Sequence, residues 1–425
     1  MQNRPMKRRQ LWYAVAALQL LGAVKLAAQA STGPMDLTGV LTRPEVQRAL
    51  SALDAATPTM AQGLAALGAI ESPSGGEQQR ATEVARRMRA MGLTDVRVDA
   101  QPNVIGRIPG TSGRAIVFVS TLDDLASIPA LQRSAGRPPR VEGTRVVGPG
   151  TNTSATTQAM LSAAEALLAS GVKPTHDLVF AAVAQEETGL VGMKALYAEY
   201  RDRADAFVDI LGDGRSITYG ALGIHWWRVV ARGPAGHSLN GGVPNVNQAI
   251  GRAVDRILSL PQPPAGNNPQ RTILNIAMLQ SGAVFNHKPD SGWFSLDIRS
   301  LDANVIARNE AAVQRILDDV ARETGLSLSM QPVTRTPGGQ IAGADTSRLV
   351  RASVAIARHL GLQPTLGNAG SANLNVAIGG GTLAIGLGGE RGGARGQPGE
   401  FADIPAMLRT AKHVLLLALV MGDAR

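Results

Sequence analysis

The stretch from Leu178 to Glu187 runs through an unbroken apolar segment and then into two adjacent carboxylates, Glu186 and Glu187. An apolar segment of this length, rich in valine and alanine, is typical of a strand buried on both faces of a sheet. Carboxylates at the C-terminal end of such a strand are costly to bury unless they meet a cation or take part in catalysis. An exposed helix start, where acidic residues are favourable, is the alternative for an isolated pair.

The segments on either side of this stretch alternate between strand and helix patterns. Residues 96–98 and 115–119 read as strands, and residues 157–169 read as an Ala/Leu-rich helix. Strand, helix and strand in this order predict a parallel sheet covered by helices. The expected fold class is α/β, with a parallel-type mixed sheet, helices on both faces, and a smaller α+β domain interrupting it.

The length of 425 residues exceeds what one ordinary core accommodates, and 44% hydrophobic with 18% charged residues indicates a globular chain. The pattern changes near Ile217, where strands and two helices form an insert of a different texture. We therefore expect four segments: 1–30 as a signal peptide, 31–220 and 337–425 as two parts of one α/β domain, and 221–336 as a dimerisation or lid domain.

The N-terminus has the features of an export signal. Basic residues from Arg4 to Arg9 precede an apolar run, Leu11 to Val24, and Ala28-Gln29-Ala30 offers a cleavage site. The sequence predicts a periplasmic or extracellular protein after cleavage near Ala30, with no membrane contact. Retention of the segment as an anchor is the open alternative, and no later segment is expected to reach membrane-spanning length.

Charge and cysteine content exclude several classes of function. The net charge is +9, and five of the basic residues, with no acidic ones, lie in residues 1–30, so removal of that segment leaves +4. No lysine or arginine run is interleaved with aromatic residues, so nucleic acid is not an expected partner. The chain has no cysteine, which excludes thiol catalysis and thiolate metal sites.

Two motifs in the insert carry a family resemblance. The first is Gly233-Pro234-Ala235-Gly236-His237-Ser238, and the second ends in Asp297-Ile298-Arg299-Ser300. With them the chain resembles the dizinc exopeptidases of metallopeptidase family 20, the aminoacylase, tripeptidase T and glutamate carboxypeptidase group. The resemblance implies a homodimer formed through residues 221–336. It also implies that His237 reaches the partner's active site to stabilise an oxyanion, and that Asn275 and Arg299 contact substrate.

The resemblance also implies five metal-ligand segments, and this chain departs from most of them. Thr121 stands where the family has a ligand histidine, Thr153 where it has the bridging aspartate, and Gly396 where it has the last histidine. Threonine and glycine cannot replace these ligands at a zinc site. By the same resemblance, Glu186 matches the general base and Glu187 a metal ligand.

Two further aspartates belong to this constellation. Asp123 matches the residue that orients the first ligand histidine, and we assign it with Glu186 and His237 to the catalytic set. At the fourth ligand segment the alignment favours Leu211, while Asp209 and Asp213 remain alternatives. Glu187 and Asp213 are therefore the candidates for a residual metal site.

Three functions remain open on this reading. The first is a binding or regulatory protein without a dizinc centre or other cofactor, taking a peptide or N-acyl amino acid-like ligand. The second is a hydrolase of peptide or N-acyl amide bonds on a remodelled site, and the third is an active zinc peptidase.

If the family fold holds, Thr121, Thr153, Glu187 and Gly396 should line one cleft. Without metal, one carboxylate of the Glu186–Glu187 pair should have a raised pKa or a new basic partner, for which Arg395 is the candidate.

Overall fold

The structure is a computed structural model that describes residues 35–261, 263 and 271–423. It separates into two units, residues 1–34 and residues 35–425. The expected signal peptide and the cleavage site near Ala30 lie outside the described residues.

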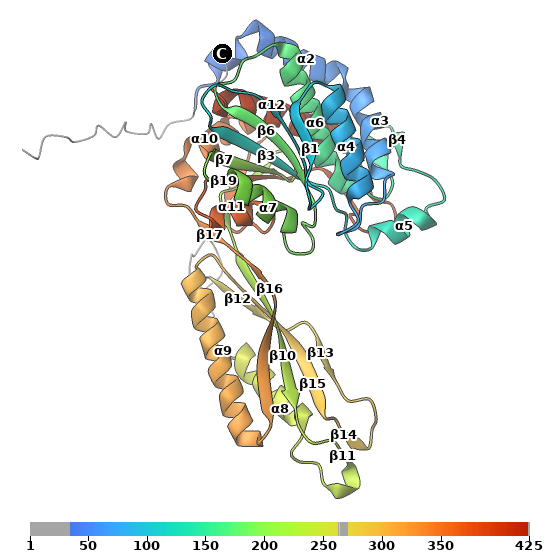
Figure 1. The fold of residues 1–425 in the computed structure, drawn as a ribbon, viewed down its shortest axis with the longest axis vertical. Coiled ribbons are helices and arrows are strands. Elements are labelled where there is room, and N and C mark those ends of the chain that lie inside the picture. The colour runs from blue at the N-terminus through green and yellow to red at the C-terminus, as the bar shows by residue number, and fades with distance from the viewer. Residues whose placement is uncertain (1–34, 262, 264–270, 424–425) are drawn as a thin grey trace, which may run out of the picture. The chain divides into compact units, whose positions relative to one another are not determined.

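Within the described part of the larger unit, eight strands form a mixed sheet in the order β1-β2-β6-β3-β7-β19-β8-β18 (Figure 1). The strands are β1 (Thr94–Val98), β2 (Val104–Ile108), β3 (Ala115–Thr121), β6 (Asp177–Val183), β7 (Ala204–Ile210), β8 (Ser216–Thr218), β18 (Thr365–Gly367) and β19 (Ala384–Gly388). Strand β3 runs parallel to both β6 and β7, and β7 runs parallel to β19, whereas β1 and β2 are antiparallel. The predicted fold class is confirmed.

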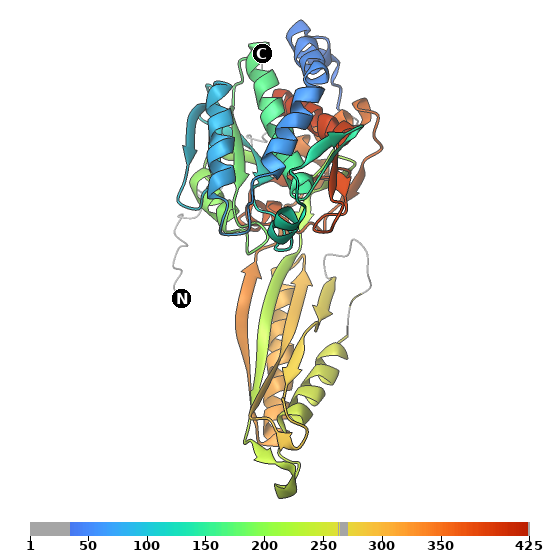
Figure 2. The same cartoon turned by 90° about the vertical axis from the view of Figure 1, so that its right-hand side faces the viewer.

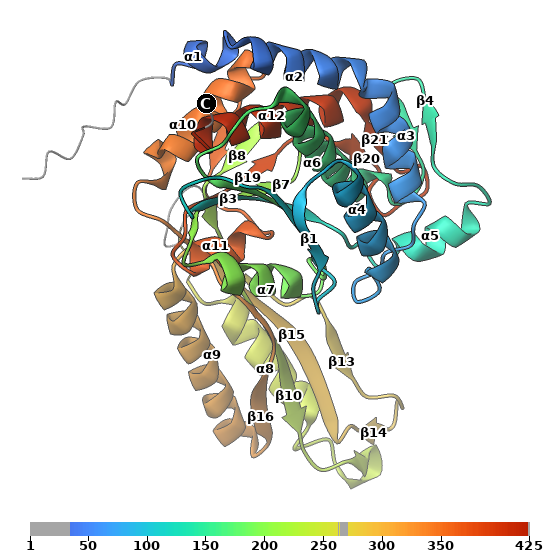
Figure 3. The ribbon, with the colours of Figure 1, turned by 45° about the horizontal axis from the view of Figure 1, so that its top comes forward.

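Helices cover both faces of this sheet (Figure 3). One face carries α2 (Pro44–Ala55), α3 (Thr57–Gly68), α4 (Gln78–Ala90), α6 (Thr151–Ser170), α10 (Arg348–His359) and α12 (Ile404–Met421), and the other carries α7 (Val191–Tyr200) and α11 (Leu374–Gly379). Alternation along β3 feeds both cores, because Ile116 and Phe118 pack on the first face while Val117 and Val119 pack on the second.

Short elements complete the α/β part of the unit. They are α1 (Thr38–Leu41), α5 (Ile128–Ser134), β4 (Arg140–Glu142), β5 (Arg145–Val147), β9 (Gly220–Ala221), β17 (Gly339–Gln340), the 3-10 turn Ala344–Thr346, β20 (Gly392–Gly393) and β21 (Phe401–Asp403). Strands β20, β21, β5 and β4 form a small antiparallel sheet. This sheet ties the chain after β19 to the segment that leads into α6.

The insert is an α+β domain with its own core. Its strands are β10 (Gly223–Arg232), β11 (Gly236–His237), β12 (Thr272–Asn275), β13 (Leu279–Ser281), β14 (His287–Lys288), β15 (Ser291–Ser300) and β16 (Ser327–Thr336). Its helices are α8 (Val246–Leu258), α9 (Ala303–Thr324) and the 3-10 turn Ser238–Asn240. Both long helices pack on one face of the sheet β12-β15-β10-β16, and among the described residues of the insert the other face carries no helix (Figure 2).

The C-terminal helix α12 corrects one expectation. Among the described residues it is the one helix long and apolar enough to cross a membrane, with 18 residues and a mean hydropathy of 1.5. In the structure 78% of that segment is buried, and it packs against α6, α2 and α10. A helix that is apolar on all sides is also typical of the core of a large α/β domain, which is where α12 lies.

Candidate active site

The two glutamates lie at the C-terminal edge of the parallel strands, as the sequence predicts. Strands β3 and β6 are in parallel register, with Thr121 opposite Val183. The chain then turns sharply, with a positive φ at Gln185 (54°) and at Gly189 (118°). This turn leaves Glu186 and Glu187 beside the end of β3.

Asp123 holds this turn in place. Its Oδ1 accepts the backbone N–H of Glu186 at 2.8 Å, and its Oδ2 accepts the backbone N–H of Glu187 at 3.1 Å and the hydroxyl of Ser74 at 2.6 Å. Asp123 is fully buried, so these three donors stabilise its charge away from water. The resemblance implies that Asp123 orients a ligand histidine. In this structure its carboxylate instead fixes the backbone of Glu186 and Glu187.

Glu186 has the perturbed acidity expected of a buried carboxylate beside other carboxylates. Burial, together with the nearby charges of Glu187, Asp209 and Asp123, raises its pKa to about 8, against a smaller lowering by Arg395. The expectation of a raised pKa in this pair is confirmed. A carboxyl group with this pKa is largely protonated at neutral pH and can donate or accept a proton there.

Glu187 has acquired the basic partner that the sequence suggested. The Arg395 guanidinium donates from Nη2 to Glu187 Oε1 and from Nε to Thr153 Oγ1, the latter at 3.3 Å. Arg395 precedes Gly396, so the segments carrying Thr153, Glu187 and Gly396 meet at this one side chain. Of the four residues expected to line one cleft, Glu187 is the one that lines the cavity described below. Thr121 lies on the adjoining strand, where its hydroxyl accepts from Asn373 at 3.2 Å.

Glu400 is a buried residue beside the site that the sequence analysis did not identify. Its buried Oε1 accepts the backbone N–H groups of Gly150 and Asn152, both at 3.0 Å, and its Oε2 accepts the N–H of Gly396 at 2.9 Å. A carboxylate at a helix N-terminus satisfies free N–H groups and complements the helix dipole. Glu400 thereby joins the start of α6 to the loop that carries Arg395.

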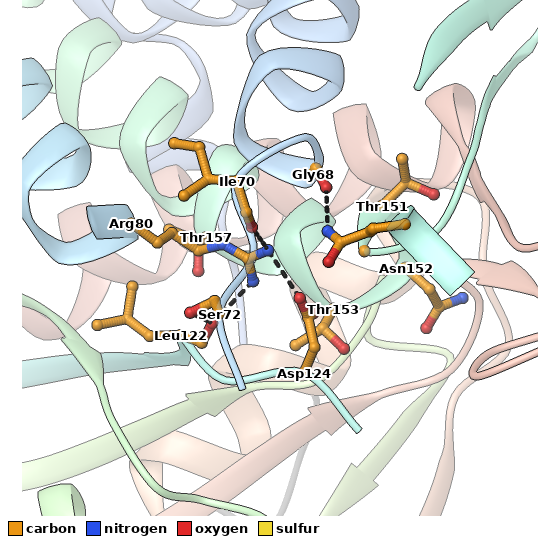
Figure 4. A network of polar contacts seen from close by, with 12 residues as sticks. Gly68, Ile70, Ser72, Arg80, Leu122, Asp124, Thr151, Asn152, Thr153 and Thr157 are labelled. Atoms are coloured by element: carbon orange, nitrogen blue, oxygen red, sulfur yellow. Dashed lines mark hydrogen bonds and ion pairs between the residues drawn. The ribbon is translucent and has the colours of Figure 1, made fainter. Parts of the chain in front are cut away.

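A buried ion pair involves the segment that follows β3 (Figure 4). Arg80 and Asp124 are almost fully buried and 2.7 Å apart, and Arg80 also donates to the carbonyls of Leu122 and Ile70. Burial raises the pKa of Asp124 to about 6 despite the opposing effect of Arg80. The pair fixes the end of the segment that follows β3, next to Asp123.

The fourth ligand segment resolves differently from the expectation. The Asp213 carboxylate is buried and pairs with Arg409, with its Oδ2 2.9 Å from Arg409 Nη2, and it also accepts the backbone N–H of Glu390. Asp209 lies opposite Val119 in the β3–β7 register, and its charge is one of those that raise the pKa of Glu186. Burial raises the pKa of Asp209 itself to about 7, while the N–H of Leu374, 3.0 Å from its Oδ2, opposes the rise.

The donor set around Glu187 does not fit a zinc ion. No group of three or more histidine, aspartate or glutamate side chains is placed to hold a metal within residues 35–261, 263 and 271–423. The positions beside Glu187 offer a threonine hydroxyl and a glycine, and a guanidinium already bonds its Oε1. Zinc sites need several anionic or imidazole donors together, and these residues do not supply them.

A cavity of about 440 Å³ opens next to the glutamates. It is lined by Glu186, Glu187, Thr188, Gly189, Leu190, Ile224, Trp226, Arg299, Val333, Thr334, Thr336, Ser371 and Ala372.

Arg299 is held by Asp297, with Nη2 2.9 Å from Oδ2. Asn275 stands opposite Asp297 in the β12–β15 register, and directly opposed residues share a face of the sheet. Arg299 and Asn275, two sequence-predicted binding residues, thus lie on the same face.

His237 lies at the opposite end of the insert from this cavity. Ile224, near the start of strand β10, lines the cavity. The strand has ten residues, so its two ends are roughly 33 Å apart. His237 follows the end that is far from the cavity. The His237 ring packs on His287 with centroids 4.9 Å apart, and its Nε2 lies 3.0 Å from the amide nitrogen of Asn286. Within one chain, the structure does not bring His237 together with Glu186.

Comparison with known proteins gives a family match. The family model for peptidase family M20/M25/M40 matches residues 133–419. No curated protein matches the chain.

The fold is shared with solved peptidase structures. The chain is similar to aminopeptidase PepT from Bacillus cereus at 20% identity and a TM-score of 0.72, over 85% of this chain and 97% of that one. It is similar to a tripeptidase from Staphylococcus aureus at 20% identity and a TM-score of 0.73, over 86% and 99%. It is also similar to a metallo-carboxypeptidase from Sulfolobus solfataricus at 14% identity and a TM-score of 0.70, over 86% and 99%.

Proposed function

The chain belongs to peptidase family M20/M25/M40, and within that family we propose that it is an exported binding or regulatory protein that works without a dizinc centre. The observation that carries the proposal is the ion pair between Arg395 and Glu187. A residue that would bind metal is instead neutralised by a side chain of the same protein. The basic and apolar features of residues 1–30 support export.

The cavity beside the glutamates supports a small ligand of the peptide or N-acyl amino acid class. Its volume of about 440 Å³ lies in the range of small-molecule sites. Ile224, Trp226 and Val333 supply apolar surface, and Arg299 supplies a guanidinium whose planar fork suits a carboxylate. A ligand carboxylate at Arg299 would replace the contact that Asp297 now makes.

We propose that the protein acts as a homodimer through residues 221–336. Large apolar side chains are exposed near β11 and β14, including Leu239, Val243, Val284 and Phe285. Apolar groups gathered in this way are typical of a protein–protein contact. Since His237 lies far from the cavity of its own chain, a partner subunit is the means by which its imidazole could reach a ligand site. Neither nucleic acid nor a membrane is proposed as a partner of the cleaved protein.

A metal-independent hydrolase is the second candidate, and one observation favours it. The pKa of Glu186 is raised to about 8 by burial, and the side chain lines the cavity. A group with this pKa can take a proton from an attacking water and return it to a leaving amine near neutral pH. Asp123 would hold Glu186 in position, and a His237 contributed by a partner would donate to the developing oxyanion.

Metal content and turnover, measured on the same preparation, test these functions. The purified mature protein is incubated with zinc, manganese or cobalt, desalted and analysed for metal, and then assayed on tripeptides and N-acyl amino acids. We expect the protein to retain no stoichiometric metal and to hydrolyse none of these compounds. We expect its melting temperature to rise in the presence of at least one tripeptide or N-acyl amino acid, because a bound ligand stabilises the folded state.

Each other outcome selects a different function. Metal-independent hydrolysis that is lost in Glu186→Gln would select the hydrolase. Two metals per chain with chelator-sensitive peptidase activity would refute the proposal and make the protein an active dizinc enzyme. A family member with an intact metal site, processed in parallel, controls for the loading procedure.

A further inference from the structure

Arg395 spans two of the positions where the metal-ligand segments meet. Its Nη2 donates to Glu187 Oε1, and its Nε donates to Thr153 Oγ1 at 3.3 Å. Glu187 is the candidate metal ligand that the chain keeps. Thr153 stands at the position where the family has the aspartate that bridges its two metals. A guanidinium presents several donors in one rigid plane and keeps its charge at any pH that a folded protein meets.

The loop that carries Arg395 is fixed on both sides. The N–H of Gly396 donates to Glu400 at 2.9 Å, and the carbonyl of Gly396 accepts the hydroxyl of Ser127 at 3.0 Å. The N–H of Gln397 donates to the carbonyl of Ala394 at 3.0 Å, which closes a turn around Arg395. The guanidinium therefore reaches Glu187 from a backbone that is already held, and little further ordering is needed for the contact.

We propose that Arg395 is a built-in counter-ion that stands between Thr153 and Glu187 in the place of a metal and excludes divalent cations from that position. The proposal rests on the proposed function, because it explains how the family scaffold keeps Glu187 without a dizinc centre. A divalent cation would have to displace the guanidinium from Glu187 Oε1 and then share the site with its charge. Coulomb repulsion between a divalent ion and a guanidinium a few ångströms apart is about several kcal/mol at the effective dielectric of a protein.

A second arginine shows that the region already holds positive charge. Burial and the charge of Arg395 together lower the pKa of Arg391 to about 10, while Glu186, Glu187 and Glu400 oppose the shift. Arg391 and Arg395 therefore both interact electrostatically with the carboxylates of Glu186 and Glu187. This arrangement supports replacement of the metal charge by side chains of the protein.

The test rebuilds ligands with and without the arginine. Thr121→His and Thr153→Asp place two new donors near Glu187, and the double variant is compared with the triple variant that also carries Arg395→Gln. Gly396 is left unchanged, because its φ is 74° and an added Cβ would lie 2.9 Å from Leu125. Zinc per chain is measured by elemental analysis, and zinc affinity is measured by the shift in melting temperature.

We expect the triple variant to bind about one zinc per chain, at least about tenfold more tightly than the double variant that keeps Arg395. Arg322→Gln in the double variant is the matched control, since Arg322 is an exposed arginine on α9 that pairs with Asp319. That control should bind zinc no better than the double variant. Equal zinc binding with and without Arg395 would refute the proposal.

A double-mutant cycle in the unmodified background tests the counter-ion role if the rebuilt variants do not fold. Arg395→Gln should lower the melting temperature by about 2–4 °C, whereas the same change in a Glu187→Gln background should lower it by less than half as much. Independent effects of the two substitutions would refute the counter-ion role. If the unmodified protein binds no metal and yet the double variant binds zinc as tightly as the triple variant, this inference fails while the proposed function stands.

Discussion

Glu186 and Glu187 are neighbours in sequence but meet different surroundings. Glu187 is neutralised by Arg395, whereas burial and three nearby carboxylates raise the pKa of Glu186 to about 8. One carboxylate is thus stabilised by an ion pair and the other by retention of its proton. Both outcomes are expected for partly buried acidic side chains at a strand edge, of which one has a guanidinium as its partner among the described residues and the other does not.

The raised pKa of Glu186 predicts a specific dependence of stability on pH. Below about pH 4.5 the group is protonated in both the folded and the unfolded state. As the pH rises from about 4.5 to 8, the unfolded chain releases a proton that the folded protein retains, so the free energy of unfolding falls and levels off above pH 8. Glu186→Gln imitates the protonated form and removes this loss.

We therefore expect the Glu186→Gln variant to become more stable than the unmodified protein as the pH rises. The difference in the free energy of unfolding should grow from near zero at pH 4.5 to on the order of 1–3 kcal/mol at pH 9. Melting curves of both proteins across this range measure it. Asp209 titrates in the same window and its charge is one of those that raise the pKa of Glu186, so the growth of the difference with pH reports the titration of this coupled pair. A difference that stays constant with pH would contradict the assigned pKa.

At the scale of elements, the start of α6 depends on a residue far along the chain. Helix α6 begins after Gly150 and has no capping side chain of its own, and Glu400 accepts the N–H groups of Gly150 and Asn152 instead. The same carboxylate holds the N–H of Gly396. A single side chain therefore fixes both the helix that carries Thr153 and the loop that carries Arg395.

Removing this carboxylate should weaken both elements at once. Glu400→Ala leaves three backbone N–H groups without their acceptor, so we expect a loss of about 2–4 kcal/mol in the free energy of unfolding, measured by denaturant titration. Glu165→Ala, an exposed residue on the same helix, is the matched control and should change stability by less than about 0.5 kcal/mol. Equal effects of the two substitutions would show that Glu400 does not anchor α6.

At the scale of the whole molecule, the insert offers surfaces that the described chain leaves open. The sheet β12-β15-β10-β16 has unpaired outer edges at β12 and β16 among the described strands, and open edges tend to pair with another chain. The exposed apolar side chains near β11 and β14 add a second contact region. Both features favour a two-fold assembly of two copies.

We expect a dimer at micromolar concentration in analytical ultracentrifugation. The double variant Leu239→Asp/Phe285→Asp should shift the equilibrium toward monomer, because both side chains are exposed in the single chain and their burial would stabilise the assembly. Its melting curve should otherwise match that of the unmodified monomer. A chain that remains monomeric at this concentration would remove the proposed role of His237 in a partner's site.

The sequence by itself determined the strand and helix pattern, the insert, and the residue types Thr121, Thr153 and Gly396 at the positions where the family resemblance places metal ligands. These features are local, since burial patterns follow from residue spacing and a threonine or glycine lacks an imidazole in any fold. Only the tertiary structure decided that Asp213 pairs with Arg409 while Asp209 lies near the glutamates. It also decided that Glu400, 250 positions from Gly150, anchors the start of α6. These contacts join residues that are far apart in the sequence, so no local sequence pattern predicts them. Only the folded chain determines which charged groups lie together in a buried site.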